Sequence, residues 1–321
     1  MTAGMVGTAS VGVVVVTHRA RDRIAACLAP LQASPLRPRI LVVNSSSADG
    51  TVEAAEALGA DTMSVPRWRF NHGLTRELAR RRLGTPVVVM LTPDAVASGP
   101  EFLERLTAPV LRGEAAVAYA RQVAGPEHGL LERAGRAFSY PEHSHVRGQA
   151  DRSRYGSYTH FCSNAAAAWS SAALDRIGGF KPTLVSEETV AAAELLAAGE
   201  SIAYVADAVV CHAHRLGPAA AFRRQFDIGY SRRLHARLLL AGEGDLQRGR
   251  RFARGVLARA LRESPAELPR ILAVLAASWA GYRTGLLGPS LPTALARRAS
   301  AQDYYWTSDV GPGGGRAALA G

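Results

Sequence analysis

The first 125 residues alternate between short apolar runs and segments with the apolar spacing of helices. Runs of β-branched residues that stop at polar turns predict strands, and apolar positions recurring every three to four residues predict helices. The expected strands are 11–17, 39–43, 62–65, 86–91 and 115–121, and the expected helices are 21–32, 51–58, 73–82 and 100–111. Strands that alternate with helices at this spacing favour a parallel, doubly wound α/β sheet.

The pattern changes after residue 125. Residues 126–160 have little apolar periodicity and are rich in Gly, His, Arg and Tyr, which predicts a long functional loop. We then expect helices at 170–177 and 187–198, the second with Ser186 as N-cap, strands at 202–205 and 208–212, and helices after Pro218. The predicted organisation is an α/β domain at 1–215, a helical extension at 216–305 and a disordered tail at 306–321 with a glycine-rich end.

Polar side chains gather where the predicted strands end. Thr17 and Arg19 follow the first strand, Asn44 and Ser46 follow the second, and Asp94 follows the apolar run at 86–91. Ligands of open α/β sheets bind beyond the carboxyl ends of the strands. An ordinary turn built from small residues would explain the polar segment 44–50 equally well. It explains the Asp94 carboxylate after a buried strand less well. These strand ends therefore predict a binding site.

Asp94 and two histidines are candidate metal ligands. His212 and His214 stand two residues apart after an apolar run, so on a strand they share one face. A carboxylate suits Mg²⁺ or Mn²⁺, and Mn²⁺ also accepts imidazole. The alternative, that these are ordinary core or surface histidines, stays open at this point.

Glu187 and Glu188 open a predicted helix. Acidic residues favour the first turn of a helix because of its dipole, which is one explanation of the pair. A carboxylate held at this position could also act as a general base. The sequence pattern leaves both interpretations open.

The positive charge is concentrated near the C-terminus. The chain has a formal net charge of +11, and residues 215–300, with 16 arginines, no lysine and five acidic residues, carry all of it. Such a basic segment predicts an anionic partner, namely a membrane surface, a nucleic acid or a phosphorylated substrate. Arginine-rich solvated helix faces are the alternative. A nucleic-acid partner is disfavoured because the segment lacks the interleaved aromatic residues of a stacking platform.

The chain shows no signal peptide and no apolar run of the length that spans a bilayer, so we expect a cytoplasmic protein. The apolar segment 271–287 is expected to be too short to cross a bilayer. With Trp279 and Arg283 near its end, it could lie on the anionic inner face of the plasma membrane, pack as an ordinary helix or form a homodimer contact. The three cysteines lack a CxxC pair, which excludes a zinc site or disulfide framework as the organising feature.

Nine short segments occur in an order that resembles family-2 glycosyltransferases of the GT-A type. They are VVTHR (15–19), VVNSSSADGT (42–51), FNHGLTR (70–76), LTPDA (91–95), FCSN (161–164), GGF (178–180), EE (187–188), CHAH (211–214) and FDIG (226–229). The resemblance covers about residues 11–290. Within the family, the FNHGxTR, TxDA, HxH and FDIG elements are most similar to rhamnosyltransferases that use dTDP-L-rhamnose.

The resemblance implies a role for each candidate residue. Binding of the nucleotide-sugar donor would fall to Thr17, Arg19, Asn44, Ser46, Arg76 and Asp94, and binding of the divalent cation to Asp94, His212 and His214. Glu188, with Glu187 beside it, would be the catalytic base. Trp169, Asn164 and the 140–160 loop would lie on the acceptor side.

The implied activity is transfer of a sugar, with inversion, from a nucleoside diphosphate to a saccharide or lipid-linked saccharide in cell-surface polysaccharide synthesis. The sequence departs from the usual family pattern at Asn44, Glu77, Pro93 and Glu188, where Asp, Asn, a polar residue and Asp are usual. The changes at Asn44, Glu77 and Pro93 motivate the alternative of a catalytically weak binding subunit of an assembly.

Overall fold

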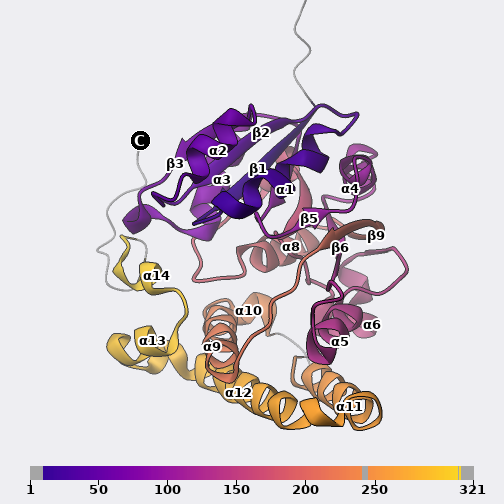
Figure 1. Ribbon diagram of the computed structural model, residues 1–321, viewed down its shortest axis with the longest axis vertical. Coiled ribbons are helices and arrows are strands. Elements are labelled where there is room, and N and C mark those ends of the chain that lie inside the picture. The colour runs from indigo at the N-terminus through magenta and orange to yellow at the C-terminus, as the bar shows by residue number, and fades with distance from the viewer. Residues whose placement is uncertain (1–9, 241–244, 310, 312–321) are drawn as a thin grey trace, which may run out of the picture.

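A single sheet organises the N-terminal two thirds of the molecule. The computed structural model describes residues 10–240, 245–309 and 311. Within them, nine strands pair in the order β3-β2-β1-β4-β8-β6-β9-β5, with β7 beside β9 (Figure 1). The strands are β1 Val11–Thr17, β2 Arg39–Asn44, β3 Asp61–Ser64, β4 Val87–Leu91, β5 Val96–Ala97, β6 Val117–Val123, β7 His145–Arg147, β8 Ala166–Ser170 and β9 Ile202–Cys211.

The sheet is mixed but mostly parallel. Strands β3, β2, β1 and β4 pair in parallel, as do β6 and β9. Strand β8 runs antiparallel to both of its neighbours, β4 and β6, so β6 and β9 keep the direction of the first four strands. The parallel arrangement expected from the alternation is therefore confirmed for these six strands. The pattern did not reveal the antiparallel strands, which are β8 and the short strands β5 and β7 beside β9.

Helices cover both faces because both faces of the central strands are apolar. Along β1, Val14 and Val16 join the core cluster that includes α3 His72–Leu83 and α8 Glu187–Ala197, while Val13 and Val15 join the cluster beneath α1 Arg21–Gln32 and α4 Phe102–Leu111. A strand that is buried on both faces reads as a continuous apolar run. This explains why the sequence VGVVVVT lacks an alternating pattern. The remaining helices of this part are α2 Thr51–Ala57 and α7 Ser171–Arg176.

Two expectations about the middle of the chain are wrong. Residues 126–160 form α5 Leu130–Ser139, β7 and α6 Arg152–Tyr155 rather than a loop, and β9 is one strand rather than two. Helix α5 is fixed by tertiary contact, because Leu130 and Leu131 are buried in a cluster formed with the C-terminal helices. Strand β9 continues through an irregularity in its pairing with β6, where the register shifts between Ala120 and Arg121.

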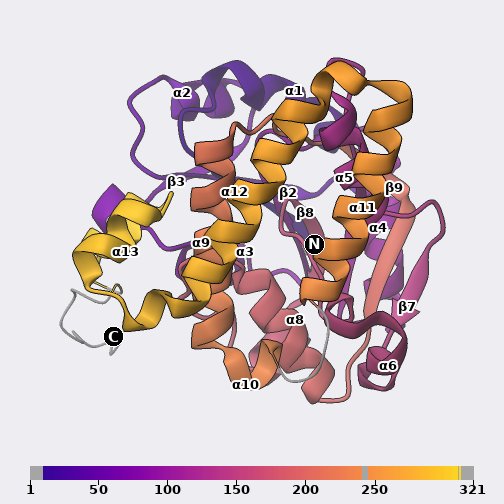
Figure 2. The same ribbon diagram turned by 90° about the horizontal axis from the view of Figure 1, so that it is seen from below.

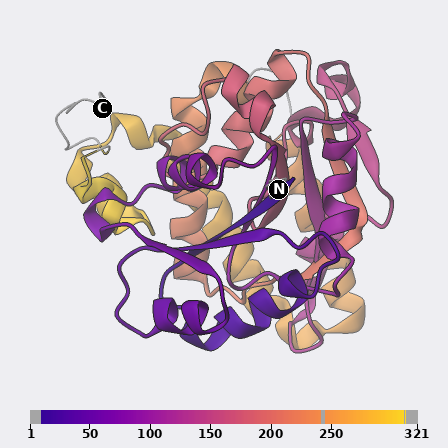
Figure 3. The same ribbon diagram turned by 90° about the horizontal axis from the view of Figure 1, so that it is seen from above.

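The C-terminal region is helical and packs beneath the sheet (Figures 1 and 2). Its helices are α9 Pro218–Leu234, α10 Ala236–Leu239, α11 Asp245–Glu263, α12 Leu268–Leu287, α13 Thr293–Ala299 and α14 Asp303–Thr307. Seen from above, the N-terminal strands and helices lie in front of them (Figure 3). Phe226 and Tyr230 of α9 belong to the same core cluster as the sheet, so the extension and the α/β domain share a core.

Helix α14 brings the chain back to the sheet. Tyr304, Tyr305 and Trp306 are buried in the main core cluster. The packed chain thus continues past the boundary expected at 305, because three consecutive aromatic residues have a core to enter. The expected disordered end, 311–321, lies outside the described residues except for Gly311.

Helix α12 is longer than the apolar segment at 271–287. In the described part of the chain, the helical stretch Pro265–Ser290 alone has the length and composition that could cross a membrane, with a mean hydropathy of 1.2. The expectation that this segment is too short is therefore wrong. Only 28% of its most apolar window is buried inside the molecule.

Candidate active site

The segment FNHGLTR builds the start of α3 and directs one arginine inward. The Asn71 side chain caps the helix by accepting hydrogen bonds from the backbone N–H groups of Gly73 and Leu74, and its amide donates to the Thr183 carbonyl at 2.9 Å. A side chain on Gly73 would clash with the Lys181 carbonyl, so only glycine lets α3 approach this segment. One turn later, Arg76 is buried and faces α8.

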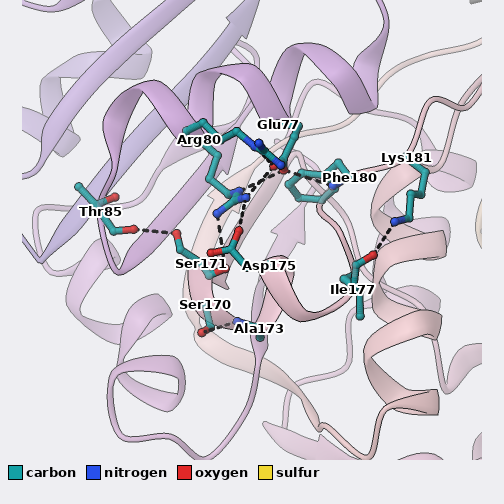
Figure 4. Close-up of polar contacts among 11 residues, drawn as sticks. Glu77, Arg80, Thr85, Ser170, Ser171, Ala173, Asp175, Ile177, Phe180 and Lys181 are labelled. Atoms are coloured by element: carbon teal, nitrogen blue, oxygen red, sulfur yellow. Dashed lines mark hydrogen bonds and ion pairs between the residues drawn. The ribbon is translucent and has the colours of Figure 1, made fainter. Parts of the chain in front are cut away.

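Glu77 clamps α3 to the segment that leads into α8 (Figure 4). Its carboxylate accepts hydrogen bonds from Arg80 at 2.6 and 3.1 Å and from the backbone N–H of Phe180 at 3.2 Å. Arg80 also pairs with Asp175 of α7 at 2.7 Å. Gly179 has a φ of +75°, and a side chain there would strike the Glu77 carboxylate. The unusual Glu77 and the GGF segment are thus one structural unit.

Glu187 and Glu188 have different surroundings. They are consecutive on a helix, so their side chains point about 100° apart. Glu187 is buried; its Oε1 accepts from Arg76 Nη1 at 2.6 Å and from the Asn164 amide at 3.0 Å. Glu188 is half-buried and lines a cavity of about 1170 Å³. Only Glu188 of this pair is therefore placed to reach a ligand in that cavity.

The two carboxyl groups also differ in acidity. Burial opposes ionisation of Glu187, but the nearby charge of Arg76, together with His72 and the Asn164 hydrogen bond, more than offsets it and lowers the pKa of Glu187 below its ordinary value. Burial and the adjacent ionised Glu187 raise the pKa of Glu188 to about 8. Ser186, the N-cap residue of α8 directly before Glu187, has a φ of +66°. Its side chain makes none of the capping hydrogen bonds expected of it.

Trp169 and Asn164 hold Glu187 and do not line the cavity. Trp169 is fully buried, and its Nε1–H donates to Asn164 Oδ1 at 2.8 Å, which orients the Asn164 amide toward Glu187. The expectation that Trp169 contacts an acceptor is therefore wrong, because its ring is packed in the core against Phe180. Arg76, which was expected to bind the donor, also faces Glu187. Only 4% of its surface is exposed, so its side chain has no free surface that could contact a donor.

Asp94, His212 and His214 come together at the ends of β4 and β9. The His214 Nε2 atom lies 3.1 Å from Asp94 Oδ2, and the His212 Nε2 atom lies 3.6 Å from Asp94 Oδ1. One potential ligand atom from each of the three residues falls within a 4.8 Å cluster. The predicted grouping of one carboxylate and two imidazoles is present in the structure.

The residues of this triad fit a divalent cation. Asp94 Oδ1 is buried and has no hydrogen-bond partner among the described residues. Burial lowers the pKa of His212, so its imidazole is neutral near pH 7, and the Gln122 carbonyl accepts from His212 Nδ1 at 2.9 Å. That hydrogen bond leaves the Nε2 lone pair of His212 facing Asp94, as a metal ligand requires. Despite its burial, the polar side chains around Asp94 keep its pKa well below the usual range, so the carboxylate is ionised.

The ends of β1 and β2 form a second polar cluster. Ser47 Oγ accepts from the Arg19 backbone N–H at 3.0 Å and donates to Asn44 Oδ1 at 2.8 Å, and Ser46 Oγ donates to the Val65 carbonyl. Arg19 and Ser46 both have positive φ values, 51° and 53°. Such strained backbone persists only where the surroundings hold it, often at ligand sites.

Within this second cluster, the predicted residues differ in accessibility. Thr17 and Asn44 are buried, and their side chains hydrogen-bond the Val43 carbonyl and the 44–47 turn respectively. Arg19 and Ser46 are both exposed. The structure therefore places Arg19 and Ser46 at a surface, with Thr17 and Asn44 shaping the loops beneath them.

Comparison with known proteins now identifies the family. The profile of glycosyl transferase family 2 matches residues 12–178, which include both the β1–β2 cluster and Asp94. The chain belongs to glycosyl transferase family 2. It is accordingly a glycosyltransferase.

Two curated relatives cover most of this glycosyltransferase. It is 30% identical over 273 residues to the O-antigen chain rhamnosyltransferase RfbN of Salmonella typhimurium, covering 84% of this chain and 87% of the relative. It is 29% identical over 272 residues to the O-antigen chain rhamnosyltransferase WbaN of Salmonella anatum, covering 84% and 86%.

Solved structures confirm the GT-A fold of the glycosyltransferase. The mannosyltransferase PcManGT from Pyrobaculum calidifontis, in complex with GDP-Man and Mn²⁺, aligns over 92% of this chain and 84% of its own, with a TM-score of 0.55 and 18% identity. TarS 1–349 of S. aureus, in complex with UDP-GlcNAc, aligns over 94% and 90%, with a TM-score of 0.54 and 14% identity. At such low identity, these likenesses concern the fold alone.

Sequence reasoning missed several residues that complete the site of the glycosyltransferase. Gln122 orients His212, and Arg136 donates to Gln122 at 2.8 Å and lines the cavity. Gln122 is a polar residue near the end of a buried strand, the same signal that singled out Asp94. Arg136 stands in a segment interpreted as a loop. The hydrogen bond of 2.7 Å between Tyr304 and His72, beside Arg76, joins residues too far apart for any sequence pattern to connect.

Proposed function

We propose that this glycosyltransferase moves L-rhamnose from dTDP-L-rhamnose to a saccharide or lipid-linked saccharide acceptor, with inversion of the anomeric centre. The names of two relatives, both O-antigen chain rhamnosyltransferases that match 84% of this chain, support the sugar. The names of the relatives do not state the nucleotide. The assignment of dTDP rests on the similarity of the FNHGLTR, LTPDA, CHAH and FDIG segments to rhamnosyltransferases that use dTDP-L-rhamnose.

One observation carries the stereochemical part of the proposal. Glu188 and both histidines of the metal triad line the same cavity, whereas Glu187 is held away by Arg76 and Asn164. A carboxylate that is open to the cavity beside a cation site suits a direct displacement, in which one base deprotonates the acceptor hydroxyl. Attack on the sugar then comes from the face opposite the leaving diphosphate and inverts the configuration.

Each residue group has a distinct task in this proposal. A cation held by Asp94, His212 and His214 would stabilise negative charge on the diphosphate. Arg19 and Ser46 would contact the nucleotide, over loops that Thr17 and Asn44 shape. Arg76 and Asn164 would position Glu187, whose negative charge raises the pKa of Glu188 and makes it a stronger base.

The test is donor turnover with product analysis. The purified protein is incubated with Mn²⁺ or Mg²⁺ and a panel of nucleotide sugars, with and without saccharide acceptors, and nucleoside diphosphate release is measured. We expect release from dTDP-L-rhamnose alone, and NMR of the glycoside should show the anomeric configuration opposite to that of the donor.

Other outcomes separate the parts of the proposal. Release from a different nucleotide sugar would overturn the rhamnose assignment and leave the glycosyltransferase. A product with the donor's configuration would contradict the direct displacement. Donor binding without turnover across the acceptor panel would instead favour a binding subunit.

A further inference from the structure

Helix α12 presents an apolar stripe to solvent. Its exposed apolar positions are Pro269, Leu272, Ala273, Ala276, Trp279 and Leu287, and the exposed Arg283 stands between the last two. Their spacing of three and four residues places them on one face of the helix. Leu272, Trp279 and Leu287 are 51%, 63% and 65% exposed, although they are among the largest apolar side chains. Over about 18 residues at 1.5 Å per residue, the stripe is roughly 27 Å long.

The opposite face of α12 is fixed to the protein. Gly281 and Gly285 meet the backbone carbonyls of Phe222 and Phe226 in α9, where a side chain would clash. Ile271 and Val274 are buried beneath the helix. Because α12 is held along its inner face, it cannot be surrounded by lipid as a spanning helix would be, and only its outer face is free to meet a partner.

Positive charge flanks the stripe. Helices α11, α12 and α13 contain ten arginines and two acidic residues, a net charge of +8. Exposed arginines lie on α11 at Arg250, Arg251, Arg254 and Arg262, on α12 at Arg283 and on α13 at Arg297 and Arg298. Figure 2 shows the three helices together on the side of the molecule opposite the N-terminal strands.

We propose that this face, formed by α11, α12 and α13, binds the surface of a bilayer that contains anionic lipids. Leu272, Trp279 and Leu287 would enter the boundary between headgroups and acyl chains, and the flanking arginines would contact lipid phosphates. A helix with an apolar face and an arginine-rich border is suited to lie in the plane of a membrane. This inference rests on neither the donor nor the acceptor of the reaction.

Charge argues for a lipid partner over a second copy of the chain. A two-fold dimer through this face would bring the same patch of each subunit together, and each patch is strongly positive. Like charges at such a contact repel, whereas anionic headgroups neutralise them.

The cavity lies between this face and the sheet, since Phe252, Val274 and Leu275 of α11 and α12 line it together with Glu188 and His212.

Vesicle co-sedimentation tests the inference. The full chain is mixed with phosphatidylcholine vesicles and with vesicles that also contain phosphatidylglycerol, at low and at physiological salt. We expect binding to the anionic vesicles, weakened by salt, and at least about tenfold weaker binding to the neutral ones.

Matched variants locate the surface. The double variant Leu272→Ser/Trp279→Ser should lower the affinity for anionic vesicles at least about tenfold, because two large apolar side chains no longer enter the bilayer. The control variant Leu58→Ser/Leu111→Ser replaces two exposed leucines at the C-terminal ends of α2 and α4, on the other side of the molecule. It should bind anionic vesicles like the wild type. Circular dichroism establishes that both variants are folded, and a blue shift of Trp fluorescence on vesicle binding should be smaller in Trp279→Phe.

Three results would overturn the inference. The first is a wild-type chain that does not bind anionic vesicles at low salt. The second is equal vesicle binding by the two double variants. The third is a shift from dimer to monomer in Leu272→Ser/Trp279→Ser by light scattering with vesicle binding unchanged, which would make this face a protein interface.

Discussion

Two adjacent glutamates at the start of α8 illustrate how position alone separates residue roles. Glu187 is ionised and held by an ion pair with Arg76 and a hydrogen bond from Asn164, whereas Glu188 opens to the cavity with a raised pKa. The longer side chain of Glu188, where the family usually has Asp, does not remove the carboxylate from the cavity. The pair therefore consists of a positioning residue and a candidate base.

We predict that Glu188→Gln lowers kcat by a factor of about 10² to 10⁴, the range expected for loss of a general base, with donor binding retained. Wild-type activity should rise with pH toward about 8, because the base acts only when deprotonated and its pKa is raised to that value. The measurement is kcat as a function of pH, with donor affinity measured separately by calorimetry.

Glu187→Gln is the informative comparison for this prediction. It removes the negative charge beside Glu188, so the pKa of Glu188 should fall and the rising limb of the pH profile should move to lower pH. A Glu188→Gln enzyme that keeps wild-type kcat would remove Glu188 from the chemistry.

Gln122 offers a second test at the residue scale. Its carbonyl fixes the ring of His212, and loss of such an orienting partner typically costs 10–100-fold in metal affinity. We predict this loss for Gln122→Ala, measured by Mn²⁺ titration of the protein and of its activity. Removal of the metal by a chelator should abolish turnover, and added Mn²⁺ should restore it.

The control replaces a glutamine away from the triad. Gln32→Ala, at the end of α1, should leave the Mn²⁺ titration unchanged. An unaltered titration in Gln122→Ala would mean that His212 needs no help to bind metal, or that it binds none.

At the scale of elements, the junction of α3 with the segment 178–183 sets the active-site geometry. Asn71, Gly73 and Glu77 all hold this segment, and Arg76 reaches Glu187 across the same junction. A departure from the family pattern, Glu77, thus has a structural explanation. It anchors Phe180 and Arg80 and makes no contact with the metal triad.

We predict that Glu77→Ala destabilises the protein by about 3 kcal/mol, because it leaves the buried Arg80 without its main partner. Despite burial, Arg80 and Arg81 lower the pKa of Glu77 below its unfolded value. Its contribution to stability is therefore present above the unfolded pKa and is lost as pH falls through the folded one. Denaturant unfolding at pH 7 and at lower pH measures both effects.

Glu104→Ala in the exposed first turn of α4 serves as the matched control and should change stability by less than about 0.5 kcal/mol. If the stability difference between wild type and Glu77→Ala does not shrink in acid, the ion pair is not its source.

At the scale of the whole molecule, the C-terminal helices are part of the main hydrophobic core. Helix α9 contributes Phe226 to the main cluster, and Asp227 of the FDIG segment accepts from the Ala301 backbone N–H at 2.9 Å. Through α14, the Tyr304 hydroxyl reaches His72 beside Arg76. The far end of the chain thus supports the residues around Glu187.

We predict that Gly285→Val lowers stability by at least about 2 kcal/mol, because its side chain would strike the Phe226 carbonyl where α12 crosses α9. Ala276→Val, on the exposed face of the same helix, should be nearly neutral. Thermal unfolding compares the two. Equal melting temperatures would show that α12 is not held to α9 through its glycines.

Most strands and helices, and the chemistry at the strand ends, could be predicted from the amino-acid pattern. Buried strands read as apolar runs because both faces are covered, and polar residues at strand ends marked Asp94, Asn44 and His212 before any fold was known. The concentration of arginine in residues 215–300 is likewise a property of composition alone. Periodicity reports local burial, so these features needed no partner to be seen.

Which residues meet depends on how the chain folds. The contact of Arg76 with Glu187 spans 111 positions and that of His72 with Tyr304 spans 232, and nothing in local spacing encodes either. The same reason explains the burial of Trp169, the helix at Leu130–Ser139 and the direction of β8. Each depends on packing against segments distant in sequence, which is also why Glu187 and Glu188 could be separated by role only once their neighbours were known.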